Sequence, residues 1–178
     1  QIGGIIFDTV NCGAYVISTL SPAAKDTAST PETGILNVSH NGSIQINATV
    51  TNSQNILVPL YVRLPSGTPG VYNFVNNSTN AVTLYIGGAT NDSANTRGTD
   101  FRLGGSNTGT NTIGALSAGT TTSGANGFTK QGAGTWILAG PNDFRAQTVV
   151  RITEGLLIVK DVAAFNAVTT GGITVTNT

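Results

Sequence analysis

The chain has 178 residues, which is enough for one domain or a short solenoid with a substantial core. Only 9% of the residues are charged and the net charge is zero, whereas ordinary globular domains carry about a quarter charged residues. This balance argues against nucleic-acid binding, which needs a basic face, and against electrostatic attachment to anionic membranes. Threonine, asparagine, serine and 23 glycines take the place of the charges. This mix favours strands and turns over helices, so the predicted class is all-β.

The N-terminal stretch is apolar but broken by Asp8, Asn11 and glycines, and it lacks the basic region of a signal peptide. The sequence has no run of 18 apolar residues, which a transmembrane helix would require, so we expect no membrane insertion of this segment. The chain has no methionine, which suggests a processed or excerpted chain and suits export after removal of a signal peptide. Cys12 has no second cysteine to pair with, so it is interpreted as a buried small residue, with an intermolecular bridge as the alternative.

The first 70 residues predict several short strands. Two apolar runs, Ile5–Phe7 and Tyr15–Ile17, are strand-like, and the polar residues 21–33 that follow them predict a loop. Alternation of apolar residues resumes over Gly34–Val62, where Pro59 restricts its strand to an edge or a bulge.

The turn cluster Leu64–Gly70 is the best boundary in the chain. It separates an N-terminal β segment, residues 1–70, from the solenoid expected in 71–178. The topology of the N-terminal segment stays open, and it could serve as a cap, in lateral packing or in assembly.

The second half predicts strands at Val71–Val75 and Val82–Ile86 and polar excursions at Ala89–Asp100 and Ser117–Asn126. Residues 127–161 then predict three more strands: Gly134–Leu138, Thr148–Ile152 and Leu156–Lys160. Compact turns around 140–142 and 153–155 separate them. Apolar residues alternate in each strand, and a unit this small can bury them only against neighbours stacked above and below it. This pattern is typical of one coil of a β-solenoid.

Residues 127–161 also resemble the passenger-associated repeat of bacterial autotransporter proteins. The residues that carry the resemblance are Phe128, Lys130, Gly132, Gly134, Thr135, Trp136, Leu138, Gly140, Asn142, Phe144, Thr148, Val150, Gly155, Leu157 and Val159. Weaker likeness extends it over about residues 81–178, and Arg145, Ala146 and Gln147 stand where the family favours glycine. The resemblance implies a right-handed parallel β-helix that is exported and displayed on a bacterial surface.

An assembly surface is predicted at Ile137, Val149, Leu156 and Ile158, because these residues place apolar side chains on the outward row of the last strands. Two explanations stay open: the N-terminal segment packs on that face, or another protein does. The ends of a solenoid also present unpaired backbone groups, which further coils of a longer chain or the next subunit would cover.

No catalytic, metal-binding or cofactor-binding residues are predicted. His40 lies in a hairpin-like turn between Leu36–Val38 and Ile44–Ile46, without partners for a triad or a metal site. Asp92, Arg97, Asp100 and Arg102 form the one charged segment where β-helix enzymes would place catalytic carboxylates, but we interpret them as a solvated surface with an ion pair. Lys130, Arg145, Arg151 and Asp161 are expected to be surface charges.

The sequence therefore predicts a non-enzymatic, extracellular structural or adhesive β-solenoid, with copies of the chain associating head to tail into a filament. Its expected partners are itself or further coils of a longer chain, and its polar loops are where surface glycans would bind. A polysaccharide-degrading β-helix enzyme and a phage fibre segment remain alternatives, because a fold alone does not decide function.

Overall fold

The computed structural model describes residues 2–18, 35–62, 69–91, 98–117, 126–144, 149–161, 165 and 173–175. Every regular element in these residues is a β-strand, and the strands pair in parallel in one extended sheet. The predicted all-β parallel β-helix is therefore confirmed. Within the described part of the chain, no helix has the length and hydrophobicity that a membrane crossing requires.

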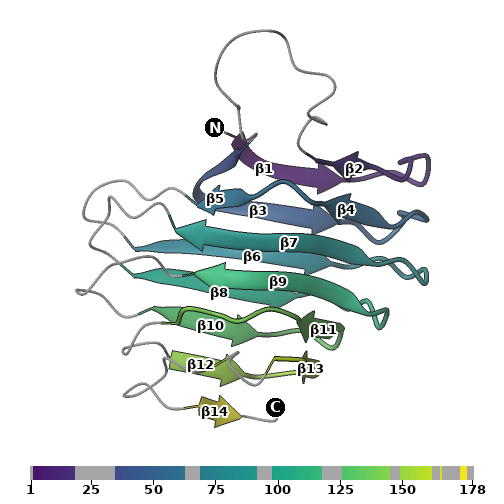
Figure 1. Cartoon of the computed structure of the whole chain (residues 1–178). Coiled ribbons are helices and arrows are strands. Elements are labelled where there is room, and N and C mark those ends of the chain that lie inside the picture. Colours follow the sequence, from purple (N-terminus) through teal and green to yellow (C-terminus); the bar gives the residue numbers. More distant parts are fainter. Residues whose placement is uncertain are drawn as a thin grey trace, which may run out of the picture.

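This one sheet winds around the axis of the stack, and each coil crosses its two main faces (Figure 1). We call these faces the first and the second sheet. The first sheet contains β1 (Ile2–Phe7), β3 (Leu36–Ile46), β6 (Gly70–Asn76), β8 (Thr99–Gly104), β10 (Gly127–Lys130), β12 (Val149–Ile152) and β14 (Ile173–Val175). The second sheet contains β2 (Val16–Ile17), β4 (Gln54–Ile56), β5 (Leu60–Val62), β7 (Leu84–Asn91), β9 (Asn111–Ser117), β11 (Thr135–Leu138) and β13 (Leu156–Val159). In Figure 1, β7 and β9 run leftward in front of β6 and β8 as the chain descends, which is the right-handed winding that parallel crossovers prefer.

The chain returns from the second sheet to the first at the same corner in successive coils. β5 is followed by β6, β7 by β8, and β9 by β10, and each of these first-sheet strands pairs with the next one in the series. Strands on either side of the proposed boundary at Leu64–Gly70 pair with one another, since β3 pairs with β6 and β5 with β7. The N-terminal residues thus wind as the first coils of the same stack.

β3 turns this corner without interruption, and β7 likewise continues from its pairing with β4 to its pairing with β5. Residues Leu36–Val38 of β3 pair with β5, whereas Ser43–Ile46 pair with β6. The bend between them lies at Asn41, which has a φ of 59°, a region that asparagine tolerates better than most residues. The predicted hairpin at His40 is therefore wrong, because one positive φ bends the strand around the corner instead of reversing it.

An unbroken aliphatic column runs inside the second sheet along the whole stack. The strand registers place its members one above another: Ile17, Ile56, Ile86, Ile113, Leu138 and Val159. The four inner members are fully buried, while Ile17 and Val159 occupy the two ends. Parallel strands lie about 4.8 Å apart, so each of these side chains contacts the next.

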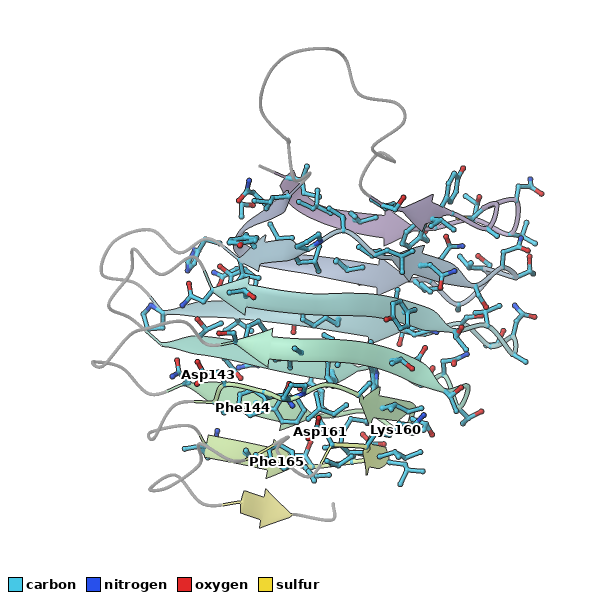
Figure 2. All side chains as sticks on the ribbon, in the orientation of Figure 1. Asp143, Phe144, Lys160, Asp161 and Phe165 are labelled. Atoms are coloured by element: carbon cyan, nitrogen blue, oxygen red, sulfur yellow. The ribbon has the colours of Figure 1, made fainter. Side chains whose placement is uncertain are left out.

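Aromatic rings fill the interior of the lower coils. Phe128 and Phe144 lie with ring centroids 5.3 Å apart, and Phe165 packs on both at 6.0 and 5.9 Å. Figure 2 shows Phe144 and Phe165 in successive levels of the stack. Nearby, Trp136 is completely buried and its indole N–H donates to the Gly104 carbonyl at 2.9 Å. The alternation predicted for 134–138 is thus confirmed, with Trp136 and Leu138 facing inward.

Candidate assembly surfaces and coil-linking residues

The N-terminal end of the stack presents two strand edges. Among the described strands, β1 pairs only with β3, and β2 pairs only with β4. Unpaired edge groups of this kind are templates for the addition of another strand. Val16, on the outer side of β2, is 61% exposed, so this end also exposes apolar surface.

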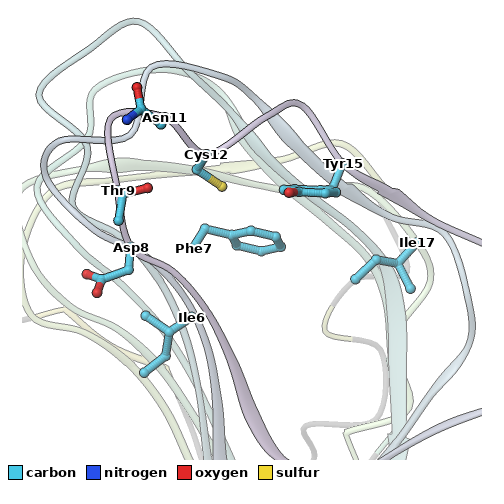
Figure 3. Close-up of a pocket in the computed structure, with 8 residues that line it drawn as sticks. All are labelled: Ile6, Phe7, Asp8, Thr9, Asn11, Cys12, Tyr15 and Ile17. Atoms are coloured by element: carbon cyan, nitrogen blue, oxygen red, sulfur yellow. The ribbon is translucent and has the colours of Figure 1, made fainter.

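A cavity of about 460 Å³ opens at the same end. Its lining is mostly apolar and comprises Ile6, Phe7, Asp8, Thr9, Asn11, Cys12, Tyr15 and Ile17. Figure 3 shows the Cys12 side chain and the rings of Phe7 and Tyr15 facing this space, and the two ring centroids lie 6.2 Å apart. Cys12 is half-buried and lines this cavity, whereas the sequence predicted a buried residue. The cavity is the open top of the coil interior.

The C-terminal end exposes a second pair of edges. Among the described strands, β13 pairs only with β11 and β14 only with β12. Leu156 is 53% exposed and Val159 is 43% exposed. Val159 belongs to the inward row, where the corresponding residues of inner coils are fully buried. Its exposure shows that the hydrophobic interior is open at this end too.

The predicted assembly residues do not form one patch. Ile137 pairs with Ile158, and Leu156 lies beside Ile158 on the outer side of the second sheet. Val149 lies in β12 of the first sheet, where it pairs with Gly127. Ile137 is only 8% exposed, which leaves Leu156 as the most exposed member.

The described N-terminal strands β1 and β2 lie at the opposite end of the stack from β13 (Figure 1). The proposal that the N-terminal segment packs on the outer face of the last strands is therefore wrong for the described residues. Those residues extend the stack instead, because they continue its parallel register.

The prediction that Lys130 is a surface charge is wrong. It follows Phe128 and Thr129 in β10 and points inward, where it is completely buried. Its ammonium group donates to the carbonyls of Gln131 at 3.0 Å, Gly132 at 2.6 Å and Glu154 at 3.0 Å. These carbonyls belong to the turns of two successive coils, so one side chain holds both turns together.

Burial lowers the pKa of Lys130 to about 8, and the Glu154 carboxylate opposes this shift. The turns that Lys130 joins contain Gly132 and Gly155, with φ values of 72° and 73°. Glycine adopts these left-handed conformations without strain. The lysine and the two glycines of the motif therefore form one structural unit. Arg151, by contrast, is exposed as predicted, and Arg145 lies outside the described residues.

Buried asparagines link coils in the same way at other turns. The Asn111 amide oxygen accepts from the Leu84 N–H at 3.0 Å, and its amide nitrogen donates to the Thr135 carbonyl at 3.0 Å. One side chain thus satisfies backbone groups in the coils above and below its own. The Asn142 amide oxygen likewise accepts from the Leu116 N–H at 2.8 Å. An unsatisfied buried backbone group costs about 1–3 kcal/mol, so these amides stabilise the register of the stack.

Asn111→Leu is expected to lower the free energy of unfolding by about 2–4 kcal/mol, because it leaves the Leu84 N–H and the Thr135 carbonyl buried without their partner. Urea denaturation followed by far-UV circular dichroism measures this loss. Thr108→Ala, at an exposed position in the preceding turn, is the matched control and should change stability by about 0.5 kcal/mol or less. Equal stability of the two variants would contradict the coil-linking role.

The charged segment considered for catalysis is only partly described. Asp100 and Arg102 lie in β8, where their side chains form an ion pair at 2.7 Å on the outer side of the first sheet. Asp92 and Arg97 lie outside the described residues. His40 Nε2 lies 2.9 Å from the Pro69 carbonyl oxygen. In the described ranges, no three His, Cys, Asp or Glu side chains gather as a metal site would require.

Sequence reasoning missed the N-terminal cavity and the inward lysine. The apolar runs Ile5–Phe7 and Tyr15–Ile17 were the available signal for the cavity, since both form its lining with the turn between them. For Lys130, the signal was its parity, because it falls on the same side of the strand as Phe128. Comparisons with protein-family models, with curated proteins and with solved structures found no match for this chain.

Proposed function

We propose that this chain is a non-enzymatic structural element of an extracellular bacterial surface. In this proposal the stacked coils form a stiff rod, and copies associate head to tail into a filament. Chain-end contacts of this heterologous type do not close on themselves, so they produce fibres.

The observation that carries the proposal is that both ends of the stack expose the same kind of surface. Among the described strands, each end has edges of parallel strands without a partner strand, and it has accessible apolar side chains, including Val16 at one end and Leu156 and Val159 at the other. The two ends also share one strand direction, so a second copy could continue both sheets without reversal.

The likeness to autotransporter passenger repeats supports the proposed location and gains a physical basis from the coil-linking residues. Lys130, Gly132 and Gly155 act together at stacked turns, and Asn142 joins neighbouring coils. These contacts give residues that carry the resemblance a structural role in this coil. Display of the passenger type places the rod outside the cell, where structural and adhesive roles are possible.

Negative-stain electron microscopy of the purified chain tests the proposal. Long uniform fibres are expected at neutral pH, and they should reform after brief exposure to acid or denaturant, because edge pairing is noncovalent. Light scattering after size-exclusion chromatography provides an independent measure of mass. Monomers alone, at concentrations well above micromolar, would contradict head-to-tail assembly.

A further inference from the structure

We propose that the junction forms by strand exchange: β1 of a second copy replaces β14 on β12, and β2 of that copy pairs with β13. This inference rests on the proposed head-to-tail filament and specifies its contact. The occupant of the C-terminal edge is then the first coil of another copy of the same chain.

The positions of the last strands lead to this arrangement. β14 lies one level beyond β13, because β12 and β13 belong to one coil and β14 pairs on the far side of β12. If a second copy stacked beyond β14, its β2 would lie two strand spacings from β13, or about 9.6 Å. The described strands of the two copies would then leave the edge of β13, with the exposed Leu156 and Val159, without a partner strand. Replacement of β14 by β1 removes the gap, because β1 and β2 are themselves one coil.

The existing strand register predicts which residues meet. In the second sheet, Ile17 of the second copy would lie on Val159, and Val16 of that copy on Ile158. The aliphatic column defined above would then continue through the junction without a break. The exposed ends of this column, which are open in one copy, would bury each other.

The first sheet gives an equivalent match. Ile5 occupies the register position that Val175 occupies six strands further down. β14 pairs with β12 through three residue pairs, whereas β1 has six residues. β12 has four residues, so β1 of a second copy can pair along its full length and displace β14, which pairs through three.

Paired cysteines test the register. In a Cys12→Ala background, Val16→Cys is combined with Ile158→Cys in the full-length chain. Within one copy these positions lie at opposite ends of the stack, so only a junction can join them. Directly paired strands bring their Cα atoms about 4.8 Å apart, which suits a disulfide. Val16→Cys with Leu156→Cys is the control, because the offset of two residues along the strand places its Cα atoms about 8 Å apart.

Mild oxidation of assembled protein is expected to give a ladder of covalent oligomers on non-reducing gels for the first pair and not for the control. Fibres that show no preference for the first pair would overturn the strand exchange and leave the filament standing. The absence of fibres from the unmodified chain under the same conditions would overturn both proposals. The Cys12→Ala background is checked for fibres first, so that a difference between the two cysteine pairs reports on the strand register.

Thr174→Pro provides a second measurement. Proline removes a backbone donor from β14 and weakens this three-residue strand, so the competitor for the β12 edge is lost. The exchange predicts a several-fold faster assembly, followed by thioflavin binding or light scattering. Slower assembly or loss of fibres would show that β14 itself forms the junction and would contradict the exchange.

Discussion

Lys130→Met is expected to lower the free energy of unfolding at pH 7 by about 2–4 kcal/mol. Methionine keeps most of the buried side-chain volume but cannot donate to the three carbonyls that the ammonium group joins. The two turns then lose the buried partner that they share. Urea denaturation monitored by fluorescence of Trp136, the only tryptophan, measures the change.

The same pair of proteins should differ in how their stability depends on pH. Lys130 has a pKa of about 8 when folded and 10.5 when unfolded. Between these values the unfolded chain binds more protons than the folded chain, so the free energy of unfolding rises with pH. The advantage of the wild type over Lys130→Met should therefore grow above pH 8, by at most about 1.4 kcal/mol per pH unit.

Measurements from pH 7 to 9.5 suffice for this comparison. Burial raises the pKa of Tyr72 to about 12, which lowers stability above pH 10 in both proteins and cancels in the difference. Glu154→Gln is a useful control. It retains the hydrogen bond from Lys130 to the backbone carbonyl of residue 154 and removes only the carboxylate that favours the charged amine of Lys130. A pH-independent difference between wild type and Lys130→Met would contradict the lowered pKa.

Gly105→Ala is expected to destabilise the stack by about 3 kcal/mol or more. Gly105 has a φ of 103°, which costs an L-residue about 1–3 kcal/mol. A Cβ at this position would also lie 2.0 Å from the Asn76 carbonyl oxygen of the coil above. Relief of this contact requires the two coils to separate, so the loss should appear as a lower urea midpoint.

Gly3→Ala is the matched control for that substitution. The nearest atom to a Cβ on Gly3 is the Ser39 hydroxyl oxygen at 4.0 Å, so the methyl group makes only an ordinary van der Waals contact. Alanine in a strand is at least as favourable as glycine, and the variant should be as stable as wild type or slightly more stable. A similar loss in both variants would show that the cost at Gly105 does not come from the close approach of coils.

The alternation of residue types predicted the strands of the last coils well. The inward positions of Trp136 and Leu138 follow from side-chain parity alone, and the structure places both in the core. The strand boundaries agree to within about a residue for β11, β12 and β13. Composition was sufficient for the all-β class because threonine and glycine replace the usual helix formers.

Other features depend on contacts between coils, which a single sequence does not display. The charge of Lys130 suggests a surface position, but three carbonyls from stacked turns make its burial possible. Asn41 and Gly42 have the composition of a hairpin turn, yet the strand continues past them because both halves find parallel partners. Val149 shares its outward parity with Ile137, but the coil places them on different sheets.

Because the second sheet returns to the first at the same corner in successive coils, the connecting segments are regularly spaced along the axis of the stack. Three segments join β5 to β6, β7 to β8 and β9 to β10. The start of each segment lies one strand spacing, about 4.8 Å, from the start of the segment in the next coil. The described strands that these segments join keep the same parallel pairing from coil to coil, so the ends of the segments repeat at this spacing. A binding epitope grafted into two such segments would therefore be presented at a spacing set by the number of coils between them.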